Sequence, residues 1–193
     1  MTELLVKPTD SRRGAQVKMG LVVIAGAALM TLAAKVQVPF WPVPMTLHTL
    51  ALMAFAVGLG PRMAVSICLA YLAAGAVGLP VFSGTPERGI GLAYMVGPTG
   101  GYLTGFLAAS WLVGILAQGR HTLGRLGAML LGLAVVYSLG AAWLSLYVPA
   151  GRVFAVGILP FLPGDLLKIG VVAALGAAVP AALAKLNRPN RGA

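Results

Sequence analysis

Residues 99–117 read TGGYLTGFLAASWLVGILA, nineteen consecutive positions without a charged side chain. A transmembrane helix needs about 20 mainly apolar residues to cross the hydrocarbon core of a bilayer. Five further apolar runs of similar character lie at about 19–36, 45–59, 62–79, 124–147 and 165–186. We therefore predict an all-α integral membrane bundle of six transmembrane helices, filling residues 19–186 between a basic tail at 1–18 and a short tail at 187–193.

The composition of the whole chain supports a membrane protein. Of 193 residues, 59% are hydrophobic and only 9% are charged, whereas a soluble domain carries about 25% charged residues. The same numbers exclude a disordered chain. The single cysteine, Cys68, rules out a disulfide within the chain.

The net charge is +10. The cations are spread between apolar runs instead of gathering on one face, so we expect them to set the orientation of the chain in the membrane rather than to bind nucleic acid. With both termini inside, ten Lys and Arg side chains fall in inner segments, three (Lys35, Arg88 and Arg152) fall in outer ones, and Lys168 heads the last run. By the positive-inside rule, both termini are predicted to be cytoplasmic, in the inner membrane of a bacterium. A cleaved signal peptide at the N-terminus is the alternative, and the five hydrophobic runs that follow argue against it.

Asp165 is the one acidic residue near a predicted span, and Lys168 follows three residues later on the same helix face. Ionisable groups in a membrane are costly unless they are paired or used. The structural alternative is an ion pair with a helix cap at Asp165. A cap leaves Lys168 at the wrong end of a helix for a cation, which favours a ligand-binding role for the pair.

The connection 80–98 is too apolar for an exposed loop, and irregular backbone at membrane depth is tolerated where it lines a cavity. Its Phe82 and Tyr94 are candidates to stack on a small ring of a ligand. Ser83 and the backbone near Gly84 are candidates to form hydrogen bonds with that ring. Arg88 has two open interpretations, a carboxylate partner at the cavity mouth or a solvated loop charge beside Glu87.

Small residues recur at four-residue spacing in several runs, for example Gly101, Gly105 and Ala109. Such faces let helix backbones approach closely in lipid. We expect most of them to pack within the bundle, with partner docking as the alternative.

Enzymatic chemistry finds little support in these residues. His48 and His121 are far apart and belong to no HExxH motif, so no metal site is predicted. An aspartyl protease needs two carboxylates, and the spans offer one. The chain also has no phosphate-binding loop, so no cofactor is expected in it and ATP would be used by partner proteins.

Four motifs occur in one order: Pro42-Val-Pro-Met-Thr-Leu-His48-Thr49, Gly78-Leu-Pro-Val-Phe82-Ser-Gly84, Gly97-Pro-Thr-Gly-Gly-Tyr102 and Asp165-x-x-Lys168. Together they resemble the BioY family, the biotin-binding S components of energy-coupling factor (ECF) transporters, over roughly residues 19–186. The family usually has Gln where this chain has His48. The Ala-x-x-x-Ala docking face common in the first helix of S components is degenerate here.

The resemblance implies a biotin-capture subunit that works with a transmembrane T protein and two ABC-type ATPases. Asp165 would then face the ureido N–H groups of biotin and Lys168 its carbonyl, while Phe82, Tyr94 and Tyr102 would form the wall for the ring system. Ser83, the backbone near Gly84, or Arg88 would hold the valerate carboxylate. Phe40 and Trp41 would close over the ligand as a lid.

Three other functions stay open on the sequence: an S component for another vitamin, a small intramembrane enzyme using Ser83, and a scaffold without a ligand. The oligomeric state is also open, a homo-oligomer included.

Overall fold

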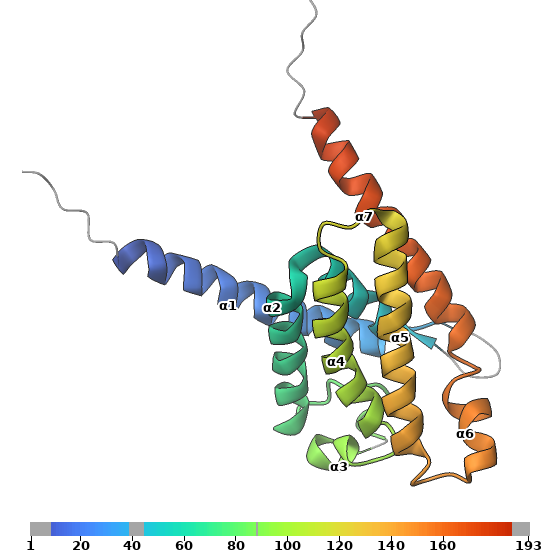
Figure 1. The fold of residues 1–193 in the computed structure, drawn as a ribbon. Coiled ribbons are helices and arrows are strands. Elements are labelled where there is room, and N and C mark those ends of the chain that lie inside the picture. Colours follow the sequence, from blue (N-terminus) through green and yellow to red (C-terminus); the bar gives the residue numbers. More distant parts are fainter. Residues whose placement is uncertain (1–8, 39–44, 88, 187–193) are drawn as a thin grey trace, which may run out of the picture.

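The computed structural model describes residues 9–38, 45–87 and 89–186, which are almost entirely helical (Figure 1). The helices are α1 (Thr9–Lys35), α2 (His48–Ala76), α3 (Gly91–Met95), α4 (Gly100–Leu116), α5 (Thr122–Leu144), α6 (Ala150–Gly157) and α7 (Leu162–Leu186). The exception is an antiparallel pair of two-residue strands, β1 (Gln37–Val38) and β2 (Met45–Thr46). The all-α prediction is confirmed for the described residues. The lid residues Phe40 and Trp41, and Arg88, lie outside them.

Helix α2 is broken in its middle at Gly60, whose φ of 79° and ψ of 177° are not helical. Glycine adopts this positive φ without the steric cost that a Cβ imposes. Pro61 follows, and proline disfavours helical backbone in the residue before it. The break therefore lies where the sequence predicts the boundary between the runs 45–59 and 62–79.

Three of the described helices are long and apolar enough to cross a membrane: residues Gln16–Lys35 of α1, all of α2, and α5. A fourth crossing results if α6 and residues 162–176 of α7, which meet at an angle of 42°, are taken as one bent span. Helix α4 is apolar but has only 17 residues. By length and composition this gives three or four spans, so the six-span arrangement is not established by this measure.

Two short helices occur where none was predicted. Helix α3 lies inside the segment 80–98, which was expected to be irregular, and it occupies the five residues between Ile90 and Val96. Helix α6 begins after Pro149, in the connection between the last two predicted spans. Both are too short to show helical periodicity in the sequence.

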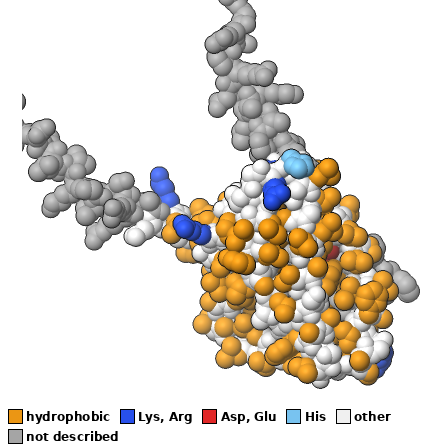
Figure 2. Space-filling view, viewed as in Figure 1, with side chains coloured by type: hydrophobic (Ala, Val, Ile, Leu, Met, Phe, Trp, Pro, Cys, Tyr) orange, Lys and Arg blue, Asp and Glu red, His pale blue; other side chains and the backbone are white. Residues whose placement is uncertain are grey.

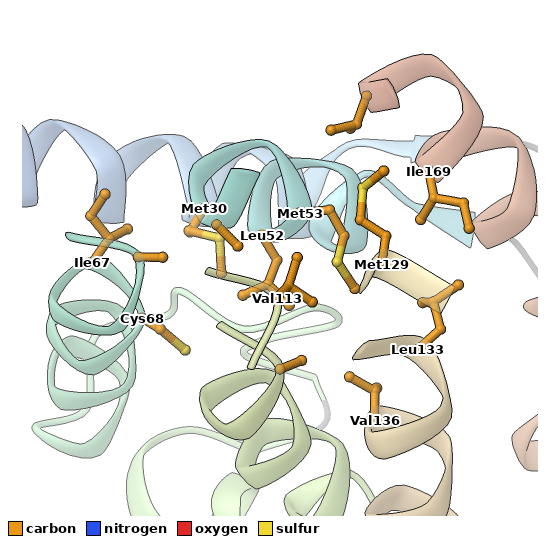
Figure 3. Close-up of a cluster of buried hydrophobic side chains, with 14 of the residues drawn as sticks. Met30, Leu52, Met53, Ile67, Cys68, Val113, Met129, Leu133, Val136 and Ile169 are labelled. Atoms are coloured by element: carbon orange, nitrogen blue, oxygen red, sulfur yellow. The ribbon is translucent and has the colours of Figure 1, made fainter. Parts of the chain in front are cut away.

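The buried core lies where α1, α2, α4, α5 and α7 meet (Figure 3). Its fully buried large side chains include Met30 of α1, Leu52 and Met53 of α2, Met129 of α5 and Ile169 of α7. Lipid chains are as apolar as these side chains, so close van der Waals packing rather than removal from water holds helices together in a bilayer.

Small residues provide that close packing between α4 and α5. A Cβ on Gly105 would lie 2.8 Å from the Cα of Val136, closer than two such carbons approach without one of them moving. Ala109, one turn further on, is completely buried. The predicted packing role of this small-residue face is confirmed.

The outer surface of the bundle is dominated by hydrophobic side chains, with Lys and Arg gathered towards its ends (Figure 2). Exposed large apolar residues occur along α1, α4, α5 and α7, for example Ile24, Trp111, Leu131 and Leu167. An apolar surface of this extent is unfavourable in water and suited to lipid.

Arg125 of α5 ties the middle of α7 to the bundle through an unusual backbone acceptor. Its Nη1 donates to the carbonyl oxygen of Gly176 at 2.7 Å. In a regular helix that oxygen accepts from the N–H four residues later, which here is Pro180, a residue without an N–H. The guanidinium therefore satisfies a carbonyl that the helix itself leaves unpaired.

We predict that Arg125→Met lowers the melting temperature in detergent by about 5 °C, because a charge-assisted hydrogen bond of about 2 kcal/mol is lost. In a Pro180→Ala background the restored intrahelical N–H replaces the guanidinium, so the same substitution is expected to cost much less. Arg120→Met, at an exposed position in the same region, is the control. Equal losses in both backgrounds would contradict this role of Arg125.

Candidate functional site

A cavity of about 290 Å³ lies among α2, α4, α5, α6 and α7 and the segment 82–99. This volume is near the lower end of the range for small-molecule sites, about 300–1,000 Å³. The lining combines a few polar groups with many aromatic ones: Thr46, His48, Thr49, Tyr71, Phe82, Ser83, Tyr94, Pro98, Thr99, Tyr102, Leu103, Phe106, Val136, Tyr137, Leu144, Val156, Gly157, Phe161, Asp165 and Lys168.

Asp165 is the centre of the polar part of the cavity. Its Oδ1 accepts from Lys168 Nζ at 2.7 Å and from Thr49 Oγ1 at 2.8 Å, and its Oδ2 accepts from the Tyr137 hydroxyl at 2.6 Å. Asp165 and Lys168 are only 5% and 7% exposed. One carboxylate thus joins α2, α5 and α7.

The structure separates the two parts of the structural alternative for Asp165, the ion pair and the helix cap. The residue lies in the first turn of α7, where the helix dipole favours a negative charge. Among the described residues, its carboxylate accepts hydrogen bonds from side chains and from no backbone N–H group. The predicted ion pair with Lys168 is confirmed, and the cap is replaced by a buried network.

The network also leaves unused hydrogen-bonding capacity. A carboxylate offers about four acceptor positions and an ammonium three donors. Three positions on Asp165 are filled, and one N–H of Lys168 is used. A polar ligand at this end of the cavity therefore meets one acceptor position on Asp165 and two N–H donors on Lys168.

Aromatic rings form a wall of the cavity. Phe82 and Tyr94 stack with centroids 4.7 Å apart and an interplanar angle of 15°, and Tyr71 meets Phe82 edge-on at 5.4 Å. The Tyr94 hydroxyl donates to the carbonyl of Ser83 at 2.8 Å. A flat apolar ligand can pack against such a surface.

Lys35, the last residue of α1, holds the backbone that carries this wall. Its Nζ donates to the carbonyl and to the Oγ1 of Thr85, both at 2.7 Å, and Thr85 Oγ1 donates to the carbonyl of Phe82 at 2.7 Å. A cation that the sequence assigned only to topology thus connects α1 to the cavity.

Tyr102 joins two other helices at the cavity. Its hydroxyl donates to the carbonyl of Gly157, at the end of α6, over 2.9 Å. A Cβ on Gly140 of α5 would lie 2.3 Å from the Tyr102 ring, so the absence of a side chain there makes room for the tyrosine.

Of the predicted binding residues, the structure brings six to the cavity: Asp165, Lys168, Phe82, Ser83, Tyr94 and Tyr102. Gly84 is not among the lining residues. Arg88, Phe40 and Trp41 belong to the part of the chain that is not described.

Sequence reasoning missed the partners of Asp165 and part of the aromatic lining. Thr49 is the last residue of the motif that begins at Pro42, and Tyr137 is a hydroxyl-bearing side chain within an apolar run. A buried hydroxyl in such a run needs a hydrogen-bond partner, and this requirement is the signal by which both residues could have been found.

Within residues 9–38, 45–87 and 89–186, no group of three or more His, Cys, Asp or Glu side chains is placed to hold a metal.

We predict that Gly75→Ala disturbs the aromatic wall. Gly75 of α2 lies under Phe82, and a Cβ there would be 2.0 Å from Phe82 Cζ, so the buried ring has to move. The substitution is expected to lower the melting temperature in detergent and to weaken ligand binding. Gly58→Ala on the same helix meets nothing within 4 Å and is the control; equal behaviour of the two variants would contradict the packing described.

The fold and the cavity define an integral membrane protein with a small cavity that combines one buried ion pair with an aromatic wall. The sequence profile of the BioY family matches residues 7–185. The chain belongs to the BioY family.

Individual relatives agree with this membership. The chain is 37% identical over 150 residues to the biotin transporter BioY of Thermotoga maritima, covering 77% of this chain and 86% of that protein. It is 36% identical over 141 residues to the probable biotin transporter BioY of Pyrococcus horikoshii, covering 73% and 83%. Among solved structures, the S component for biotin from an ECF-type ABC transporter matches with a TM-score of 0.73 at 26% identity, over 87% of this chain and 93% of that one.

Proposed function

We propose that this chain captures biotin and mediates its uptake as the substrate-specific subunit of an ECF-type transporter. The observation that carries the proposal is the buried Asp165–Lys168 pair at one end of an aromatic cavity. Relatives named as biotin transporters and the structural match to a biotin S component support the same substrate.

The polar end of the cavity complements the ureido ring of biotin. That ring offers two N–H donors and one carbonyl acceptor. Lys168 has two unused N–H groups for the carbonyl, and Asp165 has one unused acceptor position for a ring N–H. Hydrogen bonds to charged groups are about twice as strong as neutral ones, so this end would fix the orientation of the ligand.

The rest of the ligand would lie along the aromatic residues. Phe82, Tyr94 and Tyr102 offer a surface for the fused rings, and Ser83 lies beside them in the lining. The predicted carboxylate donors at Gly84 and Arg88, and the lid formed by Phe40 and Trp41, remain predictions.

The proposal includes six membrane crossings, with both ends of the chain in the cytoplasm. The two arms of α2 on either side of Gly60 would each cross, together with α1, α4, α5 and α7. The arms and α4 are short for a bilayer, and non-helical backbone such as residues 81–85, where Val81, Phe82 and Thr85 are buried, would fill the remaining depth. The inner-side excess of Lys and Arg supports this orientation.

Energy for uptake would come from partners, a transmembrane T protein and ABC-type ATPases, with ATP hydrolysed there and not in this chain. The match to an S component of an ECF-type ABC transporter supports this. The chain would thus act as a binding and transport subunit rather than as an enzyme.

We predict that Asp165→Asn weakens biotin binding by more than about tenfold. The substitution keeps the shape but removes the charge and leaves its partners imperfectly paired, at a cost of about 1–3 kcal/mol. Binding of labelled biotin to the purified protein in detergent measures the effect. Glu87→Gln, which neutralises an exposed acid, is the control.

Thermal-shift and competition measurements separate the alternatives. Biotin at 100 times its dissociation constant is expected to stabilise the chain by about 2.7 kcal/mol, with no effect of thiamin or riboflavin. Stabilisation by another vitamin would identify a different S component, and stabilisation by none would favour a scaffold. Substrate turnover abolished by Ser83→Ala would indicate an enzyme.

A further inference from the structure

His48, the first residue of α2, is held in a defined orientation in the cavity lining. Its ring meets Tyr71 edge-on with centroids 4.9 Å apart and Phe106 at 4.5 Å with an angle of 57°. It is 5% exposed. Neighbours from α2 and α4 therefore fix the imidazole.

One nitrogen of this ring has no partner. Nε2 is buried and makes no hydrogen bond with any of the described residues. Buried polar atoms in native proteins are nearly always paired. The only other such atom found in the described part of the chain is Nε of Arg125, a residue outside the cavity lining.

His48 lines the same cavity as the Asp165 network. It is the neighbour of Thr49, whose Oγ1 donates to Asp165 Oδ1 at 2.8 Å. His48 and the Asp165–Lys168 pair thus line one cavity.

The part of the cavity at Asp165 and Lys168 has one hydrogen-bond acceptor fewer than a ureido ring needs. The ring has two N–H groups, whereas three of the roughly four acceptor positions on Asp165 are already filled. Lys168 only donates. A neutral imidazole carries one acceptor nitrogen, and His48 belongs to the lining of the same cavity.

We propose that His48 is a specificity-determining residue whose Nε2 accepts a hydrogen bond from the second ring N–H of the ligand. This inference rests on the proposed function, since it takes biotin as the ligand. It assigns Asp165 one ring N–H, His48 the other and Lys168 the carbonyl.

Two substitutions test the role of His48. His48→Phe keeps an aromatic ring against Tyr71 and Phe106 but removes the acceptor, and is expected to weaken biotin binding by about tenfold. His48→Gln supplies an amide oxygen and is expected to keep most of the affinity. The probes are biotin and its two mono-N-methyl derivatives: blocking the N–H that faces His48 should weaken binding to the wild-type protein about tenfold and to His48→Phe far less.

A measurement on the wild-type protein gives the test without relying on the folding of a variant. The chain has two histidines, His48 and His121, and His121 is exposed. With ¹⁵N-labelled histidine, biotin is expected to shift the Nε2 signal of His48 and leave His121 unchanged.

The outcomes distinguish this inference from the proposed function. If wild-type protein does not bind biotin, the proposed function itself fails. If it binds biotin while His48→Phe keeps full affinity, or while the Nε2 signal of His48 does not move, His48 is a packing residue and the inference is overturned.

Discussion

The buried carboxylate of Asp165 is the interaction on which the rest of this structure depends. It accepts hydrogen bonds from side chains of α2, α5 and α7, and one of these donors is the ammonium of Lys168. Removing one partner of a buried ion pair is strongly destabilising because a charge is left uncompensated. The three helices are therefore held in register at the polar part of the cavity.

Around this centre, the long helices and the segment 80–98 contribute different parts of the cavity lining. Helices α2, α5 and α7 carry the Asp165 network, whereas the segment carries the stacked rings of Phe82 and Tyr94. Lys35 anchors the segment through Thr85, so the position of α1 and the position of the aromatic wall are linked. A ligand that touches both the wall and the Asp165 network would connect all parts of the bundle.

The sequence predicted the features that arise from local composition. Long apolar runs predicted the long helices, the boundary between the runs 45–59 and 62–79 coincided with the break in α2, and the i, i+3 spacing placed Asp165 and Lys168 together. Contacts between distant segments could not be read in this way. The bonds from Thr49 and Tyr137 to Asp165 span 116 and 28 residues, and the cavity position of His48 follows from how α2 packs on α4 and α7. The short helices α3 and α6 have too few residues for a periodic signal.

The central claim is that the Asp165–Lys168 end of the cavity binds the ureido ring of biotin. A structure of the protein determined with bound biotin tests it most directly. The account predicts the ring carbonyl within about 3 Å of Lys168 Nζ and one ring nitrogen within about 3 Å of Asp165 Oδ2. Biotin bound elsewhere, or with its carboxylate at Lys168 and its ring away from Asp165, would contradict it.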